Sequence, residues 1–192
     1  MLEREFAFSW SFISRIKRSD IKPPLAIVTL LGLLNSVSLI RVFASTNYDL
    51  EVQIYAVAGA GFSVIVSVGM AYLIWLLYAG GFYTLATYLF DGDGDFPVLL
   101  RVVGWGFIGL LTGRTVTLTF HMVTGFKQSL SGTAQVIAPV VGTLTGLLFF
   151  ATVVFWTISV YDTLSLNIKE SVITVVAPVA FSMLVLALPY LI

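Results

Sequence analysis

Cysteine is absent from the 192-residue sequence, and histidine occurs only once, at His121. The missing cysteine excludes disulfides, thiolate metal sites and cysteine nucleophiles. A single histidine excludes a multi-histidine metal site within one chain. The sequence also lacks the metalloprotease, nucleophile-elbow and phosphate-loop motifs. We therefore expect neither a cofactor nor enzymatic activity.

Charged residues are also scarce, at 10% of the chain against roughly 25% in soluble domains. The formal net charge is zero, which gives no basis for nucleic-acid binding. Hydrophobic residues instead make up 58% of the sequence, and the mean hydropathy is +1.00. This composition is typical of an integral membrane protein, and the length suits one compact helical domain.

Five apolar segments are long enough to cross a bilayer, because a spanning helix needs about 20 mainly apolar residues. The predicted fold is therefore an all-α bundle of five transmembrane helices within one domain, residues 23–192. The second apolar run continues to residue 90, which is too long for one perpendicular span. We expect it to leave the membrane near Gly80 and Gly81 and to continue as an aromatic interfacial piece. The predicted spans cover residues 24–43, 53–79, 98–120, 134–160 and 171–192.

The first 22 residues form a separate, amphipathic segment. Its apolar residues recur at helical spacing and fall on one face, whereas most of its basic residues lie elsewhere. This pattern predicts a short helix lying at the membrane interface, and the alternative is an ordered tail packed on the spans. Pro23 and Pro24 end the segment. The apolar face comprises Leu2, Phe6, Trp10, Ile13 and Ile16.

Basic residues next to the spans predict the orientation, because short cytoplasmic flanks are enriched in lysine and arginine. Five of them precede the first span, so we expect a cytoplasmic N-terminus and, after an odd number of spans, Ile192 outside. No cleavable signal peptide is apparent, since the first apolar span begins late. The short N-terminal segment favours a prokaryotic cell membrane. The five basic residues are Arg4, Arg15, Lys17, Arg18 and Lys22.

Polar residues inside the predicted spans are candidates for function. Arg114 lies about two helical turns from the outer end of the third span, surrounded by threonines. It either snorkels outward or pairs structurally, or it lines a polar cavity. Asn35 in the first span is expected to make an interhelical hydrogen bond. His121 is expected to face water at the external end of the third span.

Small residues spaced four apart predict seams where helix backbones approach closely. We expect them to pack the bundle, and homodimerisation through one seam is the alternative. The candidates are Gly59, Ser63 and Ser67 in span two, Gly109 and Gly113 in span three, and Gly142 and Gly146 in span four.

Three aspartates alternate with glycines in the stretch "DGDGDF", at Asp91, Asp93 and Asp95. A helix–loop–helix calcium site requires glycine at its sixth position and glutamate at its twelfth. Those positions hold Phe96 and Val102, so we expect no specific metal site, with weak binding of a hard cation as the alternative. The stretch instead predicts a tight cytoplasmic turn. Its acids are expected to contact the basic N-terminal residues Arg15, Lys17 or Arg18.

Two stretches of the chain together resemble the Yip domain family of Ypt/Rab-interacting membrane proteins. The first is "LLYAGGFYTLATYLFDGDGDFPVLLRVVGWGFIG". It is similar to the family's glycine-rich loop, phenylalanine and "L-R-x-x-G-[YW]" opening of the next span. The second, "FFATVVFWTISVYDTLSLNIKESVITVVAPVAFSMLVLALPYLI", resembles the last two spans, and the resemblance covers residues 20–192. The motif positions are Gly92, Gly94, Phe96, Leu100, Arg101, Gly104 and Trp105.

The resemblance implies a non-enzymatic membrane protein that organises the bilayer or other membrane proteins, with homo-oligomerisation possible. Family members often carry a basic residue in the glycine loop, where this chain has aspartates, and the long polar N-terminal region of eukaryotic members is missing. These departures put small-GTPase binding in doubt and indicate the prokaryotic branch. The alternative function is a small oligomeric transporter or channel subunit, with Arg114 in a polar cavity that favours anions.

Overall fold

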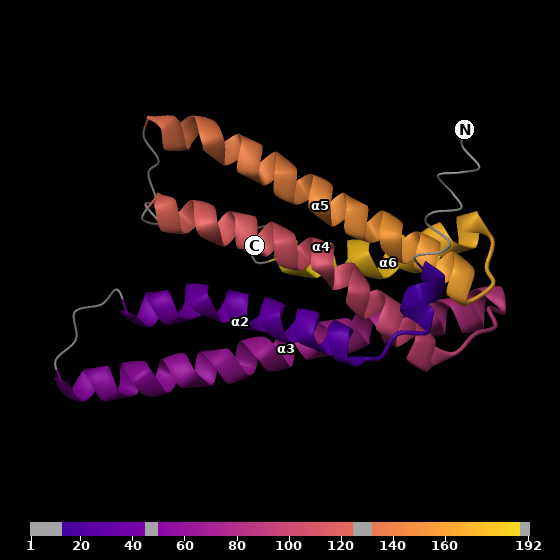
Figure 1. Ribbon diagram of the computed structural model, residues 1–192, viewed down its shortest axis with the longest axis horizontal. Coiled ribbons are helices and arrows are strands. Elements are labelled where there is room, and N and C mark those ends of the chain that lie inside the picture. The colour runs from indigo at the N-terminus through magenta and orange to yellow at the C-terminus, as the bar shows by residue number, and fades with distance from the viewer. Residues whose placement is uncertain (1–12, 45–49, 125–131, 189–192) are drawn as a thin grey trace. The chain divides into compact units, whose positions relative to one another are not determined.

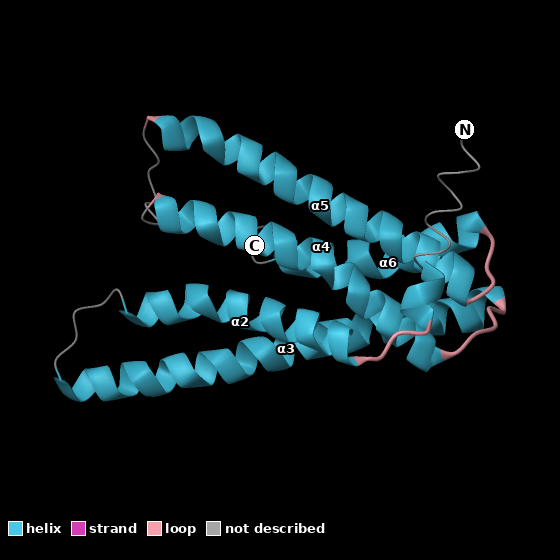
Figure 2. Ribbon diagram, viewed as in Figure 1, coloured by secondary structure: helices cyan, strands magenta, loops and turns pink. Residues whose placement is uncertain are grey.

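The computed structural model describes residues 13–44, 50–124 and 132–188, and within these ranges every regular element is a helix (Figures 1 and 2). Apolar residues without interrupting charges favour helices here, because a helix satisfies its own backbone hydrogen bonds in lipid. A helical turn over residues 13–17 precedes the long helices. These are α2 (Lys22–Ala44), α3 (Leu50–Phe90), α4 (Phe96–Val123), α5 (Thr133–Thr163) and α6 (Ile168–Ala187).

Four helices of the described chain are long and apolar enough to cross a membrane. The described apolar part of α2, Lys22–Val37, is shorter than these four. The chain is thus all-helical with four candidate membrane spans. The predicted first span at 24–43 falls on this α2 helix. The four candidates are Val57–Phe90, Phe96–Val123, Thr133–Thr163 and Ile168–Val185.

The helices divide into two compact units. Unit 1 contains the described residues up to Pro24, the segment Trp75–Gly106, and the chain from Thr152 onward. Unit 2 contains Leu25–Ile74 and Phe107–Ala151. Helices α2, α3, α4 and α5 therefore contribute one part to each unit, whereas α6 belongs to unit 1 alone.

The core of unit 1 is built around the fully buried indole of Trp156 on α5. Its ring centroid lies 5.1 Å from that of Tyr78 and 5.6 Å from that of Phe82, both on α3. The indole Nε1 donates a hydrogen bond of 2.9 Å to the carbonyl oxygen of Val103 on α4. A side chain at Gly106 would overlap the indole, so glycine is required for this approach. One aromatic residue thus joins three helices.

Helix α3 continues without a break through the predicted exit at Gly80 and Gly81. In the predicted interfacial piece that follows, Phe82 and Ala86 are fully buried in unit 1, whereas Tyr88 is 83% exposed. One side of this piece therefore packs against protein instead of serving as free interfacial area. Burial of these residues explains why the helix persists beyond the length of a single perpendicular span.

Unit 2 pairs the rest of α2 with the first part of α3. A Cβ atom at Gly32 would lie 2.6 Å from the Cα of Val68, so the two backbones approach closely there. The hydroxyls of Thr29 and Tyr72 lie 2.6 Å apart in a second contact between the same helices. A small residue and a shared hydroxyl contact are the features expected of helices that pack in lipid.

Residues of some predicted small-residue seams are packed or buried, whereas the glycines of one seam have no neighbour. Gly113 packs against the Thr145 methyl group, 3.3 Å from the position of a Cβ, and the hydroxyls of Thr117 and Thr145 lie 3.3 Å apart. Ser63 and Ser67 are buried. The other seam is open, because a Cβ at either of its glycines, Gly142 and Gly146, would have no neighbour within 4 Å.

Substituting Gly106→Ala should destabilise the protein, because the added methyl group overlaps the buried Trp156 ring. Overpacking of this kind costs about 1–3 kcal/mol. We expect a lower apparent melting temperature in thermal unfolding of the protein in lipid nanodiscs. The matched control is Gly80→Ala in the same unit, which adds a methyl group in open space. Equal melting temperatures for the two variants would contradict this account of the core.

Candidate functional site

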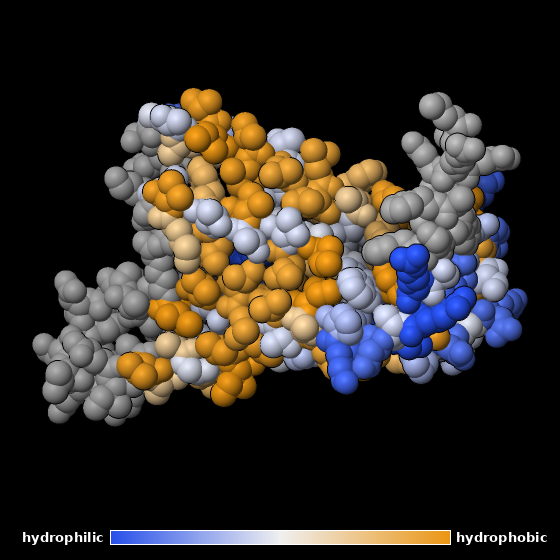
Figure 3. All heavy atoms as spheres, viewed as in Figure 1, coloured by the Kyte–Doolittle hydropathy of each residue, from blue (hydrophilic) through white to orange (hydrophobic). Residues whose placement is uncertain are grey.

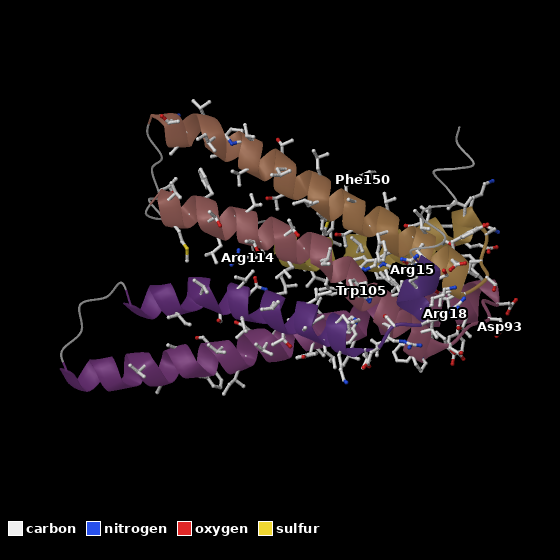
Figure 4. All side chains as sticks on the ribbon, in the orientation of Figure 1. Arg15, Arg18, Asp93, Trp105, Arg114 and Phe150 are labelled. Carbon is white, nitrogen blue, oxygen red and sulfur yellow. The ribbon has the colours of Figure 1, made fainter. Side chains whose placement is uncertain are left out.

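The residues that the family resemblance singles out lie together in unit 1, where the chain's described N-terminal part is bound. We call residues 13–24 the N-terminal segment, and we call Arg101, Gly104, Trp105 and Asp162 the docking site. Figure 4 shows Trp105 on α4 near the helical turn that carries Arg15 and Arg18. Figure 3 shows hydrophilic residues gathered over the same part of unit 1.

The N-terminal segment begins with the helical turn over residues 13–17. Ser19 ends this turn, because its backbone N–H and its hydroxyl both donate to the carbonyl oxygen of Ile16, at 3.0 and 2.7 Å. Ile13 and Ile16 are only 2% and 3% exposed, whereas Arg15 and Arg18 are exposed. The two described isoleucines of the predicted apolar face are therefore directed into protein. Leu2, Phe6 and Trp10 lie outside the described residues.

Four polar contacts between three pairs of residues fasten this segment to the docking site. The Nζ atom of Lys17 lies 2.5 Å from the Oδ2 atom of Asp162 and donates to the carbonyl oxygen of the same residue at 2.9 Å. Arg101 donates from Nη1 to the carbonyl oxygen of Ser19 at 2.9 Å. The Nε1 atom of Trp105 donates to the Ser19 hydroxyl at 3.3 Å. Arginine and tryptophan of the motif thus both bind Ser19.

The glycine of the same motif provides space for the end of the segment. A Cβ atom at Gly104 would lie 2.7 Å from the Cβ of Pro24 and 3.0 Å from the Trp75 ring. Trp75 is held in turn by a hydrogen bond of 2.9 Å from its Nε1 atom to the carbonyl oxygen of Leu100. Three residues of the sequence Leu-Arg-x-x-Gly-Trp, Arg101, Gly104 and Trp105, therefore contact the N-terminal segment.

The loop between α3 and α4 is fixed by its backbone. The N–H of Gly92 donates to the Ala86 carbonyl oxygen at 3.0 Å, and the N–H of Asp93 donates to the Leu164 carbonyl oxygen at 3.2 Å. A side chain at Gly94 would overlap the Thr163 carbonyl oxygen. The glycines are thus required by the close approach of this loop to the end of α5.

Phe96, the last motif position in the loop, packs edge-on against Tyr83, with ring centroids 5.5 Å apart. The aspartates of the loop, Asp91, Asp93 and Asp95, are exposed. Among the described residues, no group of three or more histidine, cysteine, aspartate or glutamate side chains is placed to hold a metal ion.

The predicted contact between the aspartate run and Arg15, Lys17 or Arg18 is not an ion pair among the described residues. Lys17 pairs with Asp162, and the ion pairs of the described chain do not include the run. Lys17 does share a cavity of about 380 Å³ with Asp93 and Asp95. Asp162 is the stronger partner because it offers a carboxylate and a backbone carbonyl at the C-terminal end of α5, where the helix dipole attracts cations.

The intramembrane polar residues predicted from the sequence belong to unit 2, so they form no part of the docking site. Arg114 on α4 is partly buried, and its Nε atom has no exposed surface. Asn35 on α2 is half-buried, and His121 near the end of α4 is exposed. The structure therefore separates the residues of the alternative transporter function from those of the family motif.

Ser19, Trp75 and the partner role of Asp162 are absent from the sequence-based prediction. Lys17 and Asp162 lie 145 residues apart, so no local spacing relates them. The only available signal was compositional, because Asp162 is one of the few acids in a chain with 10% charged residues.

The apolar helices define a polytopic integral membrane protein. The sequence pattern of the Yip1 domain matches residues 8–188, which is nearly the whole chain. The chain therefore belongs to the Yip1 domain family, as its motif predicts. No curated protein and no solved structure matches the chain.

Substituting Gly104→Ala should loosen the N-terminal segment, because the methyl group would overlap Pro24 and press on Trp75. We expect trypsin to cleave the variant in nanodiscs faster than wild type after Arg15, Lys17 or Arg18, since cleavage requires local opening. The control is Gly80→Ala in the same unit, whose methyl group would have no neighbour within 4 Å. Cleavage of both variants at the wild-type rate would argue against the docking described here.

Proposed function

We propose that this protein is a non-enzymatic member of the Yip1 domain family that organises membrane by shaping the bilayer. The proposal rests on the contacts that the family motif makes with the N-terminal segment. Arg101, Gly104 and Trp105 bind an amphipathic segment of the chain itself. A receptor for an amphipathic segment fits a protein that works on a lipid surface.

The proposed arrangement in the membrane has five spans, with α2 as the first. The N-terminal segment is cytoplasmic and amphipathic, the C-terminus lies outside, and the membrane is a prokaryotic cell membrane. The five basic residues before the first span support this orientation. On this arrangement the docking site faces the cytoplasmic headgroups.

The proposed partners are the lipid bilayer and other membrane proteins, including further copies of the chain. A second copy would pack on the open seam of Gly142 and Gly146 on α5. Small residues there would allow two helix backbones to approach. The aspartates of the loop keep small-GTPase binding in doubt, and no nucleic-acid binding is proposed.

Removing residues 1–18 should reduce bilayer shaping while leaving the apolar helices inserted. The reason is that an apolar face inserted into one leaflet expands that leaflet. We expect fewer tubules from liposomes that contain the truncated protein than from liposomes with the full chain. Insertion is checked by carbonate extraction, and Lys22→Gln controls for the loss of one exposed charge. Equal tubulation by the truncated and full-length proteins would refute bilayer shaping by this segment.

The second candidate function is anion transport by an oligomer, and the buried Nε atom of Arg114 within an apolar helix favours it. Under this hypothesis, proteoliposomes should show chloride flux that Arg114→Ala reduces at least tenfold, since removing a charge-assisted contact costs about 1.5–3 kcal/mol. The measurement is the chloride efflux rate at matched protein density. Absence of flux from the purified wild-type protein would eliminate this function.

A further inference from the structure

The apolar face of the N-terminal segment has two competing uses, which are packing against protein and insertion into a leaflet. The spacing of Ile13 and Ile16 puts them on the face that the proposed function inserts into a leaflet. In the structure the same two side chains are 2% and 3% exposed and belong to unit 1. A side chain packed in protein cannot at the same time displace lipid. The bilayer-shaping state must therefore differ from the docked state.

The contacts of the docked state are suited to reversible release. The hydrogen bonds of Lys17 and Ser19 to the docking site are all only partly buried. The side chains of Lys17 and Asp162 keep 26% and 22% of their surface exposed. Ion pairs that remain this accessible are weakened by salt and by competing ions.

The charges around this contact identify the competitor. Arg15 and Arg18 are exposed on the same helical turn, three residues apart and therefore on one side of it. Phosphate groups of anionic lipids attract juxtamembrane arginine and lysine. They would also compete with Asp162 for Lys17. The segment runs directly into the apolar helix α2, which begins at Lys22 and holds it near the headgroups.

We propose that the N-terminal segment is a switch with two positions. In one position Lys17 is paired with Asp162, and Ile13 and Ile16 are packed in unit 1. In the other, an anionic phospholipid surface takes Arg15, Lys17 and Arg18, and the two isoleucines enter the leaflet. The strength of the contacts at the docking site determines the relative populations of these two positions. This inference rests on the proposed function.

The absence of native cysteine gives a direct test. The thiol of an Ile16→Cys variant is protected while the segment is docked and reacts with N-ethylmaleimide when it is released. In nanodiscs of phosphatidylcholine, adding Lys17→Gln should raise the labelling rate about tenfold, the effect of losing about 1.4 kcal/mol. Lys22→Gln is the matched control, because Lys22 pairs locally with Asp20 and is 85% exposed. It should leave the rate unchanged.

A second substitution tests whether the positive charge holds the segment. Lys17→Arg keeps a cation that can donate to the carboxylate and carbonyl oxygens of Asp162, so labelling should stay slow. General damage to the fold at this position would speed labelling in both variants. A Lys17→Gln rate equal to that of Lys22→Gln, or fast labelling of Lys17→Arg, would overturn the proposal.

The lipid requirement is tested in the same Ile16→Cys background. Replacing part of the phosphatidylcholine with phosphatidylglycerol should raise the labelling rate about tenfold, because the basic residues gain lipid phosphates while the Lys17–Asp162 pair is lost. N-ethylmaleimide is small and membrane-permeant, so it reaches a thiol at the headgroup boundary. The double variant Arg15→Gln and Arg18→Gln should lose this increase while keeping the slow rate in phosphatidylcholine. Free inorganic phosphate at matched charge should have no comparable effect. Equal labelling in both lipids, or an equal effect of free phosphate, would overturn the switch.

Liposome tubulation by the same variants separates this inference from the proposed function. Faster labelling of Lys17→Gln together with increased tubulation supports both. Faster labelling without any change in tubulation supports the switch and overturns bilayer shaping. Unchanged labelling, with tubulation that still depends on residues 1–18, overturns the switch and leaves the proposed function standing.

Discussion

The hydrogen bond from the Trp156 indole to the Val103 carbonyl oxygen determines how the rest of unit 1 is built. The large ring is fully buried and contacts Tyr78 and Phe82 on α3, and it reaches α4 only because Gly106 has no side chain. Three helices are thereby held at fixed spacing by one residue. In lipid, where apolar contact alone gives little preference between helices, such close packing and a satisfied polar group decide which helices associate.

The loop and the docking site both depend on this arrangement. Because α4 and α5 are fixed together, the loop after α3 can form its backbone contact between Asp93 and Leu164. The same spacing places Asp162, at the end of α5, within reach of an N-terminal segment that also binds the start of α4. The family motif is therefore a set of packing and docking positions. Its glycines allow close approach, and Arg101 and Trp105 supply the directional contacts.

Burial of Ile13 and Ile16 links this packing to function. An amphipathic segment has a single apolar face, and protein and lipid compete for it. The free-energy difference between the docked and released positions is set by a few partly exposed polar contacts. A difference of this kind is small enough for an ion pair or a lipid headgroup to shift the population from one position to the other. A membrane protein with few charged residues can thus keep a responsive element by concentrating its charges in one unit.

The sequence by itself determined the class of protein, the helical elements and the family, because apolar run length and glycine spacing are local properties that a bilayer and a tight turn require. It also predicted the amphipathic face of residues 13–16 and the tight turn at Asp91–Asp95. Only the tertiary structure decided that α3 continues past Gly80, that Ile13 and Ile16 are buried in protein, and that Lys17 pairs with Asp162 rather than with the aspartate run. These outcomes depend on contacts between residues far apart in the chain, which a local pattern does not encode. A lysine selects its partner by the geometry of the helix end beside it, and that geometry exists only once the helices have packed.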